Sequence, residues 1–332
     1  MFDGARIVIV LGTYNGGRFV REQIESIQAQ TVGNWTLLIR DDASDDGTVD
    51  LIAALAKDDA RIRVVDHGHS RLGIVGNFGE LMRIADAEGA DYILCSDQDD
   101  VWTESKIQEQ LAHLRNMEER YGQNTPILVY SDLEVVDEQL RRIHPSFMSY
   151  QGLRHESRDP LRVLLTQNFV TGCATAMNRA LLQVAVPLPP TAIMHDWWMA
   201  LCGATCGQLA YLPKALVRYR QHGANRLGAE GLLTMLNPLS DASSRRLSLS
   251  EYYVSGSIRH AAMLSERIVS RGVPCSPDAL LLLKRFAACG RQGRLRRLWT
   301  VCQLKLRRQG LFRQLLLYWR FLVSSPCRTA RG

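Results

Sequence analysis

The sequence lacks the residue patterns of secreted, zinc-binding and membrane-spanning proteins. Its eight cysteines include no CxxC pair, and Cys202 and Cys206 have no His or Cys pair nearby, so we expect neither a zinc site nor a disulfide framework. No stretch reaches the roughly 18 to 20 uninterrupted apolar residues of a membrane span. The apolar run from Arg6 to Leu11 is too short for the core of a signal peptide. These absences favour a reducing, cytoplasmic location.

Charge is distributed unevenly along the 332 residues. The composition, with 46% hydrophobic and 22% charged residues, is that of a globular protein and excludes disordered and fibrous classes. The first 240 residues carry 22 Lys and Arg against 30 Asp and Glu, a net charge of −8, whereas residues 241–332 carry 18 against 4, a net charge of +14. A basic tail can bind nucleic acid, an anionic lipid surface or an acidic protein.

Short apolar runs alternate with helical patterns in the first part of the chain. We predict strands at 7–11, 35–40, 61–65 and from Tyr92 onward, with helices between them. Such alternation predicts an α/β fold with a mostly parallel sheet and right-handed crossovers. Ligands of such sheets bind beyond the carboxyl ends of the strands.

The later part of the chain carries further elements. We predict a helix over Trp102 to Tyr121 and two short strands, at 211–213 and 216–220. From about Leu232 only helical patterns follow. The sequence therefore predicts a catalytic α/β domain at 1–231 and a basic, helical extension at 232–332.

Acidic residues gather at the carboxyl ends of two predicted strands. The run 41–46 follows the second strand, and Asp97-Gln98-Asp99-Asp100 follows the fourth. Carboxylates held close together raise each other's pKa values unless a cation lies between them, and their hard oxygen atoms suit Mg²⁺ or Mn²⁺. The alternative interpretation is a solvated acidic turn in which Asp100 caps the next helix.

Several motifs together resemble a known family. Thr13-Tyr14-Asn15, the run 41–48 and the run 96–102 resemble family 2 glycosyltransferases of the GT-A fold, over roughly residues 5 to 225. The runs 73–78, 171–173, 195–198 and 219–222 are similar, more narrowly, to a bacterial rhamnosyltransferase-like branch. The resemblance implies a Rossmann-like sheet flanked by helices and transfer of a sugar with inversion.

The resemblance also implies a donor site and a metal site. The nucleotide-sugar donor would contact Thr13, Tyr14, Asn15, Asp41, Asp42, Gly73, Asn77, Asp97 and Arg220, although the sequence does not say whether Asp41 or Asp42 meets the base. Asp97 and Asp99 would form the DxD motif, with Asp99 as the direct ligand of Mg²⁺ or Mn²⁺ and His222 as a third ligand. His222 could equally be structural, and Arg220 could simply neutralise the acidic mouth of the site.

Asp196 matches the family's general base, which takes the proton of the acceptor hydroxyl. The alternative interpretation is that Asp196 is the N-cap of the helix that follows. The acceptor would lie against His195, Trp197, Trp198 and Gly172.

The basic tail contains leucine-rich helices with tryptophan and arginine, at 280–286, 295–306 and 311–323. Such basic amphipathic segments suit the interface of a membrane. The alternative is a helical appendage packed on the core with a solvated basic face. Aromatic residues at helical spacing argue against nucleic-acid binding, since they form no basic strand platform.

The resemblance thus predicts an inverting, metal-dependent glycosyltransferase. It favours L-rhamnose from dTDP-rhamnose as the donor sugar and a bacterial surface glycan as acceptor, such as lipopolysaccharide core, O-antigen or exopolysaccharide. The enzyme would lie at the periphery of the cytoplasmic face of the inner membrane. The alternatives are a UDP-hexose transferase, a nucleotidyltransferase or a non-catalytic sugar-nucleotide-binding protein, and a homo-oligomer is left open.

Overall fold

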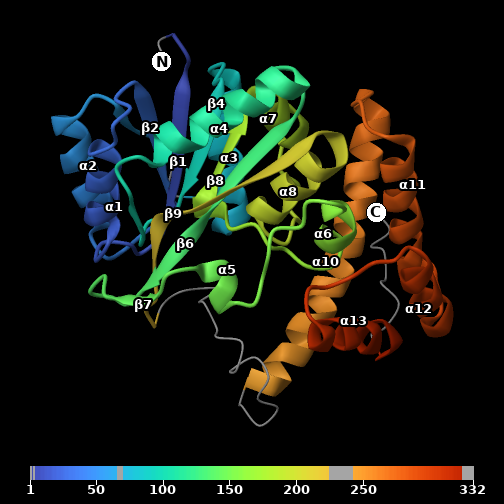
Figure 1. Ribbon diagram of the computed structural model, residues 1–332. Helices are drawn as coiled ribbons and strands as arrows, with labels where there is room; N and C mark the ends of the chain where they lie inside the picture. The colour runs from blue at the N-terminus through green and yellow to red at the C-terminus, as the bar shows by residue number, and fades with distance from the viewer. Residues whose placement is uncertain (1, 3, 66–69, 224–241, 324–332) are drawn as a thin grey trace.

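The computed structural model describes residues 2, 4–65, 70–223 and 242–323, and Figure 1 shows their arrangement. The described residues form a nine-stranded sheet in the order β3-β2-β1-β4-β8-β6-β9-β5, with β7 beside β6. The strands are β1 (Ile7–Thr13), β2 (Trp35–Asp41), β3 (Ile62–Val64), β4 (Tyr92–Ser96), β5 (Val101–Trp102), β6 (Ile127–Val136), β7 (Arg142–His144), β8 (Thr175–Asn178) and β9 (Gln208–Arg220).

The first four strands of this order are parallel, as predicted. β1 pairs with β2 on one side and with β4 on the other, and β2 pairs with β3. Parallel pairing brings the carboxyl ends of β1, β2 and β4 to one edge of the sheet. The Thr13 turn and both acidic runs therefore meet at that edge.

The second half of the sheet is mixed. β8 runs antiparallel to both β4 and β6, while β9 runs parallel to β6. The prediction of two short strands at 211–213 and 216–220 was wrong, because one strand covers both and the pairing register shifts between Leu212 and Ala215. Pro213 lies in that shift, where its missing N–H does not break the ladder.

Helices cover both faces of the sheet. One face carries α1 (Val20–Gln28), α2 (Thr48–Asp58) and α4 (Lys106–Tyr121), and the other carries α3 (Gly73–Ala87), α7 (Arg179–Ala185) and α8 (His195–Cys206), with α5 (Phe147–Tyr150) and α6 (Pro160–Leu164) in the connection between β7 and β8. Ile7, Ile9 and Leu11 of β1 face the first core, and Val8 and Val10 face the second. This explains why β1 is apolar throughout. Trp102 lies in β5, so the predicted helix begins only at Lys106.

The C-terminal helices share the second core. They are α10 (Ala242–Arg271), α11 (Pro277–Ala288), α12 (Arg294–Gln303) and α13 (Leu311–Val323), and they stand beside the sheet, on the right in Figure 1. Leu264, Phe286 and Phe321 belong to the same buried cluster as Trp198 of α8. The predicted boundary at 231/232 lies outside the described residues. None of the helices described is both long and apolar enough to cross a membrane.

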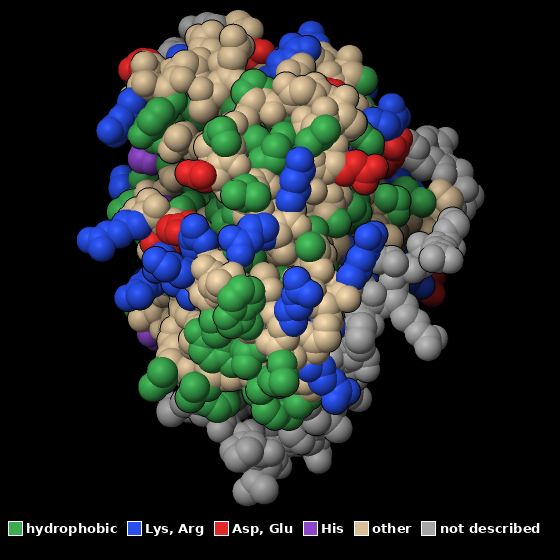
Figure 2. Space-filling view, turned by 90° about the vertical axis from the view of Figure 1, so that its right-hand side faces the viewer, with side chains coloured by type: hydrophobic (Ala, Val, Ile, Leu, Met, Phe, Trp, Pro, Cys, Tyr) green, Lys and Arg blue, Asp and Glu red, His purple; other side chains and the backbone are tan. Residues whose placement is uncertain are grey.

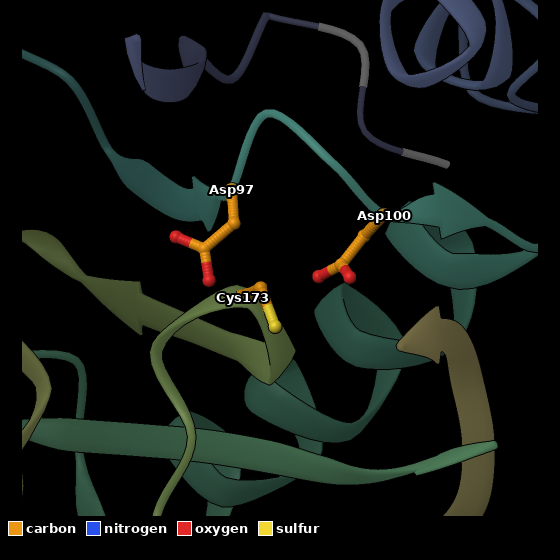
Figure 3. Close-up of side chains that lie close together, drawn as sticks. All are labelled: Asp97, Asp100 and Cys173. Carbon is orange, nitrogen blue, oxygen red and sulfur yellow. The ribbon is translucent and has the colours of Figure 1, made fainter. Parts of the chain in front are cut away.

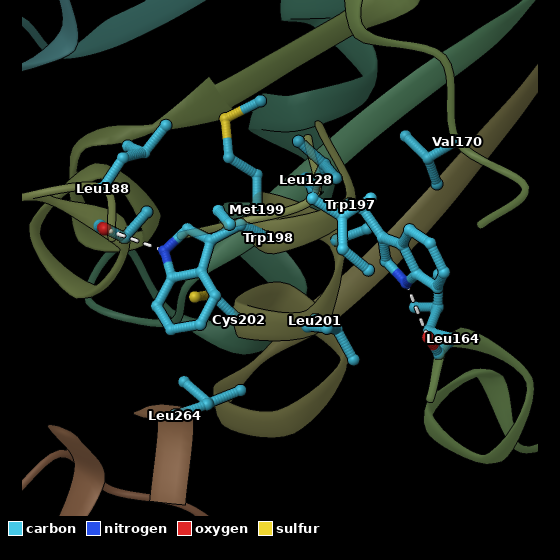
Figure 4. Close-up of a cluster of buried hydrophobic side chains, with 14 of the residues drawn as sticks. Leu128, Leu164, Val170, Leu188, Trp197, Trp198, Met199, Leu201, Cys202 and Leu264 are labelled. Carbon is cyan, nitrogen blue, oxygen red and sulfur yellow. Dashed lines mark hydrogen bonds between the residues drawn. The ribbon is translucent and has the colours of Figure 1, made fainter. Parts of the chain in front are cut away.

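Trp198 is the largest fully buried side chain described. Figure 4 shows it among Leu188, Met199, Cys202 and Leu264. Its Nε1–H donates to the carbonyl oxygen of Ala185 at 2.9 Å. We predict that Trp198→Ala lowers the free energy of unfolding by about 3 to 5 kcal/mol, because it opens a cavity and removes this hydrogen bond.

Urea unfolding of the full chain tests this prediction. Trp299→Ala is the matched control, because the Trp299 side chain is 59% exposed, and it should change stability by no more than about 0.5 kcal/mol. Equal losses in the two variants would contradict the assignment of Trp198 to the core.

Candidate active site

The turn after β4 brings carboxylates together at the edge of the sheet. Asp100 is fully buried, and Asp97 and Asp99 are partly exposed. Ligand atoms of Asp97, Asp100 and Cys173 lie within 4.8 Å of one another. Figure 3 shows the two carboxylates on either side of the Cys173 thiol, which comes from the short 3₁₀ helix η1 (Gly172–Ala174).

This cluster is short of positive charge. Burial, and then the charges of Asp99 and Asp196, raise the pKa of Asp97 to about 7. Burial and the charges of Asp99 and Asp97 likewise raise the pKa of Asp100, whose Oδ2 has no hydrogen-bond partner among the residues described. Burial keeps the Cys173 thiol neutral by raising its pKa.

Lys106 does not supply the missing charge. Its ammonium donates to Gln110 Oε1 at 2.8 Å and lies 3.8 Å from the centre of the Trp102 ring. Burial lowers its pKa to about 7. The arrangement fits a divalent cation held by carboxylate oxygens, since a neutral thiol is a poor ligand for Mg²⁺ or Mn²⁺.

The structure also brings His222 to this turn, with its Nε2 2.8 Å from Asp99 Oδ2. The sequence allowed two roles for Arg220, contact with the diphosphate or neutralisation of the acidic mouth of the site, and its position fits the second. Its guanidinium is buried, with Nε donating to the Asp99 carbonyl oxygen at 2.8 Å and Nη2 donating to Glu22 at 2.7 Å. Arg220 therefore anchors the acidic turn to β9, and the predicted contact with a donor diphosphate does not fit its position.

Thr13, Asn15 and Asp41 meet around Ser44 at the ends of β1 and β2. Asp41 Oδ2 accepts from Thr13 Oγ1 at 2.7 Å and from Ser44 Oγ at 2.6 Å. The Asn15 N–H donates to Ser44 Oγ at 2.8 Å, with Asn15 at a φ of 48°. Asp41 remains partly exposed, so this group can face a ligand.

Tyr14 links the same turn to the acidic run. Its N–H donates to Gln98 Oε1 at 2.8 Å, and Gln98 Nε2 donates back to the Tyr14 carbonyl at 2.9 Å. The Tyr14 ring is 38% exposed and lies 4.0 Å from the Arg71 guanidinium. The exposed ring is thus held at the mouth of the site.

Asp42, Gly73 and Asn77 lie farther from the mouth of the site than Asp41 and Tyr14. Asp42 is buried and accepts from Arg40 at 3.0 Å and from the backbone N–H groups of Leu72 and Gly73 at 2.6 and 2.8 Å. Asn77 Oδ1 accepts from Arg40 at 3.2 Å. Asp41 also accepts three hydrogen bonds, from Thr13 Oγ1 and from the Ser44 hydroxyl and N–H, so burial is what distinguishes Asp42 from the partly exposed Asp41.

Asp196 begins α8 beside this cluster. It accepts from the Gly172 N–H at 3.1 Å and from Asn168 Nδ2 at 3.2 Å, and is 9% exposed. Burial raises its pKa to about 6, against the lowering effect of these bonds and of the Trp197 N–H. A carboxylate poised near neutral pH, next to Asp97, can act as a general base.

Gly172 allows a close approach at this point. A Cβ on Gly172 would lie 2.6 Å from His195 Nε2. His195 is buried and stacks on Phe78 with ring centres 3.9 Å apart, and burial lowers its pKa to about 3. His195 is therefore neutral and lies behind Gly172.

The two indoles are also buried. Trp197 is 5% exposed and donates to the Leu164 carbonyl at 2.6 Å, and Trp198 lies in the core described above. The prediction that His195, Trp197 and Trp198 present surfaces to an acceptor does not fit side chains that solvent hardly reaches. They form the wall behind Asp196.

Sequence reasoning gave no role to several residues of the site. Asp100 lies in the run 96–102 and Cys173 in the run 171–173, so their place within these motifs was the signal that could have identified them. Asn168 carries no local signal, because its partner Asp196 is distant in the chain. Arg40 was also missed, although its ion-pair partner Asp42 is only two residues away. His260 of α10, which accepts from the Ile193 N–H at 2.9 Å, supports the segment before Asp196 and could be found only from the fold.

A cavity of about 770 Å³ lies at the opposite, amino-terminal edge of the sheet. Its lining includes Asp91, Tyr92, Arg179 and Arg271. It is remote from the 97–100 turn, which follows the other end of β4. We therefore assign the chemistry to the carboxylate edge.

Comparison with known proteins agrees with this assignment. The family model described as Glycosyl transferase family 2 matches residues 8–184. The chain is 27% identical over 225 residues to an uncharacterized glycosyltransferase of Nostoc sp., covering 66% of this chain and 66% of that protein. It is 25% identical over 228 residues to the dTDP-rhamnosyl transferase RfbG of Shigella flexneri, covering 66% and 74%.

Among solved structures, the mannosyltransferase PcManGT of Pyrobaculum calidifontis, in complex with GDP-Man and Mn²⁺, superposes with a TM-score of 0.52. The superposition covers 90% of this chain and 73% of that chain at 14% identity, and it shows a common fold. The family match covers more than half of the chain, so the protein belongs to glycosyl transferase family 2 and is a glycosyltransferase with the GT-A fold.

Proposed function

We propose that the enzyme transfers a hexose, with inversion, from a nucleoside diphosphate sugar onto a bacterial surface glycan. The observation that carries this proposal is the position of Asp196 beside the Asp97 cluster, which joins a candidate base to a candidate diphosphate site. Similarity to a dTDP-rhamnosyl transferase favours dTDP-rhamnose as the donor. A UDP-hexose is the second candidate.

Asp41 is the proposed contact for the pyrimidine base. It is partly exposed beside Thr13 and Asn15, whereas Asp42 is buried beneath Arg40 and the backbone N–H groups of Leu72 and Gly73. The Tyr14 ring would cover the nucleotide from the mouth of the site.

Asp97 and Asp99 are the proposed ligands of Mg²⁺ or Mn²⁺, with His222 beside Asp99. When bound, the cation would neutralise the diphosphate leaving group as a Lewis acid. Asp100 lies buried beside Asp97, and Arg220 would hold the turn in place. Without a cation, this acidic edge would repel a diphosphate.

Asp196 is the proposed general base. Gly172 and Asn168 orient its carboxylate, and its raised pKa makes it a better proton acceptor than an ordinary aspartate. The acceptor hydroxyl would approach from the side of Asp196. We propose lipopolysaccharide core, O-antigen or exopolysaccharide as acceptor, at the cytoplasmic face of the inner membrane.

Asp196→Asn should reduce kcat by about 10² to 10⁴-fold, because the amide cannot take the hydroxyl proton. Donor binding, measured by calorimetry, should stay close to wild type. Asp58→Asn, an exposed aspartate at the end of α2, is the control and should leave transfer unchanged. Retention of activity in Asp196→Asn would remove Asp196 from the reaction.

The pH dependence follows from the same group. Because burial raises the Asp196 pKa to about 6, the base is protonated below that pH and ionised above it. At saturating metal, kcat should fall about tenfold per pH unit below pH 6 and level off above it. A rate–pH profile that is flat between about pH 5 and 7 would contradict this.

Removal of the divalent cation should abolish transfer, and Mn²⁺ or Mg²⁺ should restore it. Asp99→Asn should lower kcat/KM by at least about tenfold even at high metal concentration, because a charged ligand becomes neutral. Assays after chelation and after re-addition of each metal measure the effect. Undiminished transfer after thorough chelation would rule out the proposed metal site.

A further inference from the structure

Helices α12 and α13 expose large apolar side chains on adjoining faces. On α12, Leu295 and Trp299 are 78% and 59% exposed. On α13, Leu311, Phe312, Leu315 and Trp319 are between 44% and 77% exposed. We call these six residues the α12–α13 surface. Figure 2 shows hydrophobic side chains gathered in the lower part of this side of the molecule.

Folding does not need this surface. Leu317 and Phe321, on another face of α13, are buried in the core. Positions 311, 315 and 319 are four residues apart and therefore share the outer face of the helix. An apolar patch of this kind on a folded chain marks an interaction site.

The surroundings of the patch are basic. The sequence from Ala279 to Gly332 contains no Asp or Glu. Seven cations in or next to α11 and α12 are exposed: Lys284, Arg285, Arg291, Arg294, Arg296, Lys305 and Arg307. In Figure 2, Lys and Arg side chains border the hydrophobic patch, and acidic side chains gather in the upper half of the view.

We propose that the α12–α13 surface lies in the interface of an anionic lipid bilayer. The leucine, phenylalanine and tryptophan side chains would enter the boundary between headgroups and acyl chains, and the surrounding cations would contact anionic headgroups. Tryptophan is enriched at this depth of a membrane because its ring is apolar and its N–H is polar. A second copy of the chain fits less well, because two equally basic rims would repel each other.

This docking would place the catalytic edge toward the bilayer. In Figure 1, β1 runs downward from the top of the view, so its carboxyl end points toward the lower half of the molecule, where α13 lies on the right. Arg320 of α13 and the base Asp196 both act electrostatically on Tyr253 of α10, whose ring centre is 6.2 Å from that of Trp197. The inference rests here on the proposed function, because it brings an acceptor carried by the same bilayer to the side of Asp196.

Co-sedimentation of the full chain with lipid vesicles tests the proposal. The vesicles contain phosphatidylcholine alone or with about one third phosphatidylglycerol. The wild type should bind the anionic vesicles and not the neutral ones. Arg294→Gln/Arg296→Gln should weaken binding about fivefold for each cation removed at low salt, and Leu315→Asp/Trp319→Asp should weaken it at least about tenfold.

Val49→Asp is the matched control, because Val49 is 45% exposed on α2, far from the patch, and it should bind like wild type. Unchanged vesicle binding by Leu315→Asp/Trp319→Asp, or no wild-type binding to anionic vesicles, would overturn the proposal. So would a wild-type dimer in light scattering that this variant converts to a monomer. Donor binding by the same proteins keeps the two proposals separate, since it fails only if the proposed function fails.

Discussion

The site depends on one constraint, the crowding of carboxylates at an edge of the sheet with little water. Asp97, Asp100 and Asp196 all have raised pKa values, and for each the first cause is burial. The nearby cations relieve this little, because the pKa of Lys106 is itself lowered toward neutrality and the Arg220 guanidinium donates to the Asp99 carbonyl and to Glu22. Such an edge is costly for folding alone, and the proposed cation with its diphosphate would account for its presence.

The fold holds the crowding in place from several directions. β1 and β4 deliver the Thr13 and Asp97 turns side by side. β8 enters antiparallel beside β4 and brings Gly172 and Cys173 against the acidic turn. α10 then supports the segment before Asp196 through His260. The C-terminal helices are thus part of the same folded body as the site.

The sequence predicted the parallel strands and the meeting of the acidic runs, because apolar runs and strand ends are local features. It could not separate Asp41 from Asp42, since Asp42 is buried against Leu72 and Gly73, which are distant in the chain. It also placed Trp197 and Trp198 at an acceptor, because the sequence at the start of a helix does not show whether an indole faces the solvent or the core. For the tail, it offered packing or membrane contact as alternatives, whereas α13 buries one face and exposes another.

Calorimetric titration of the wild type with dTDP-rhamnose and UDP-hexoses, with and without Mn²⁺, tests the central claim most directly. The crowded carboxylates should repel the diphosphate in the absence of metal, so we predict binding only when Mn²⁺ is present, with dTDP-rhamnose preferred. Equal affinity with and without Mn²⁺ would show that the acidic edge does not bind the donor through a cation, and would contradict the account.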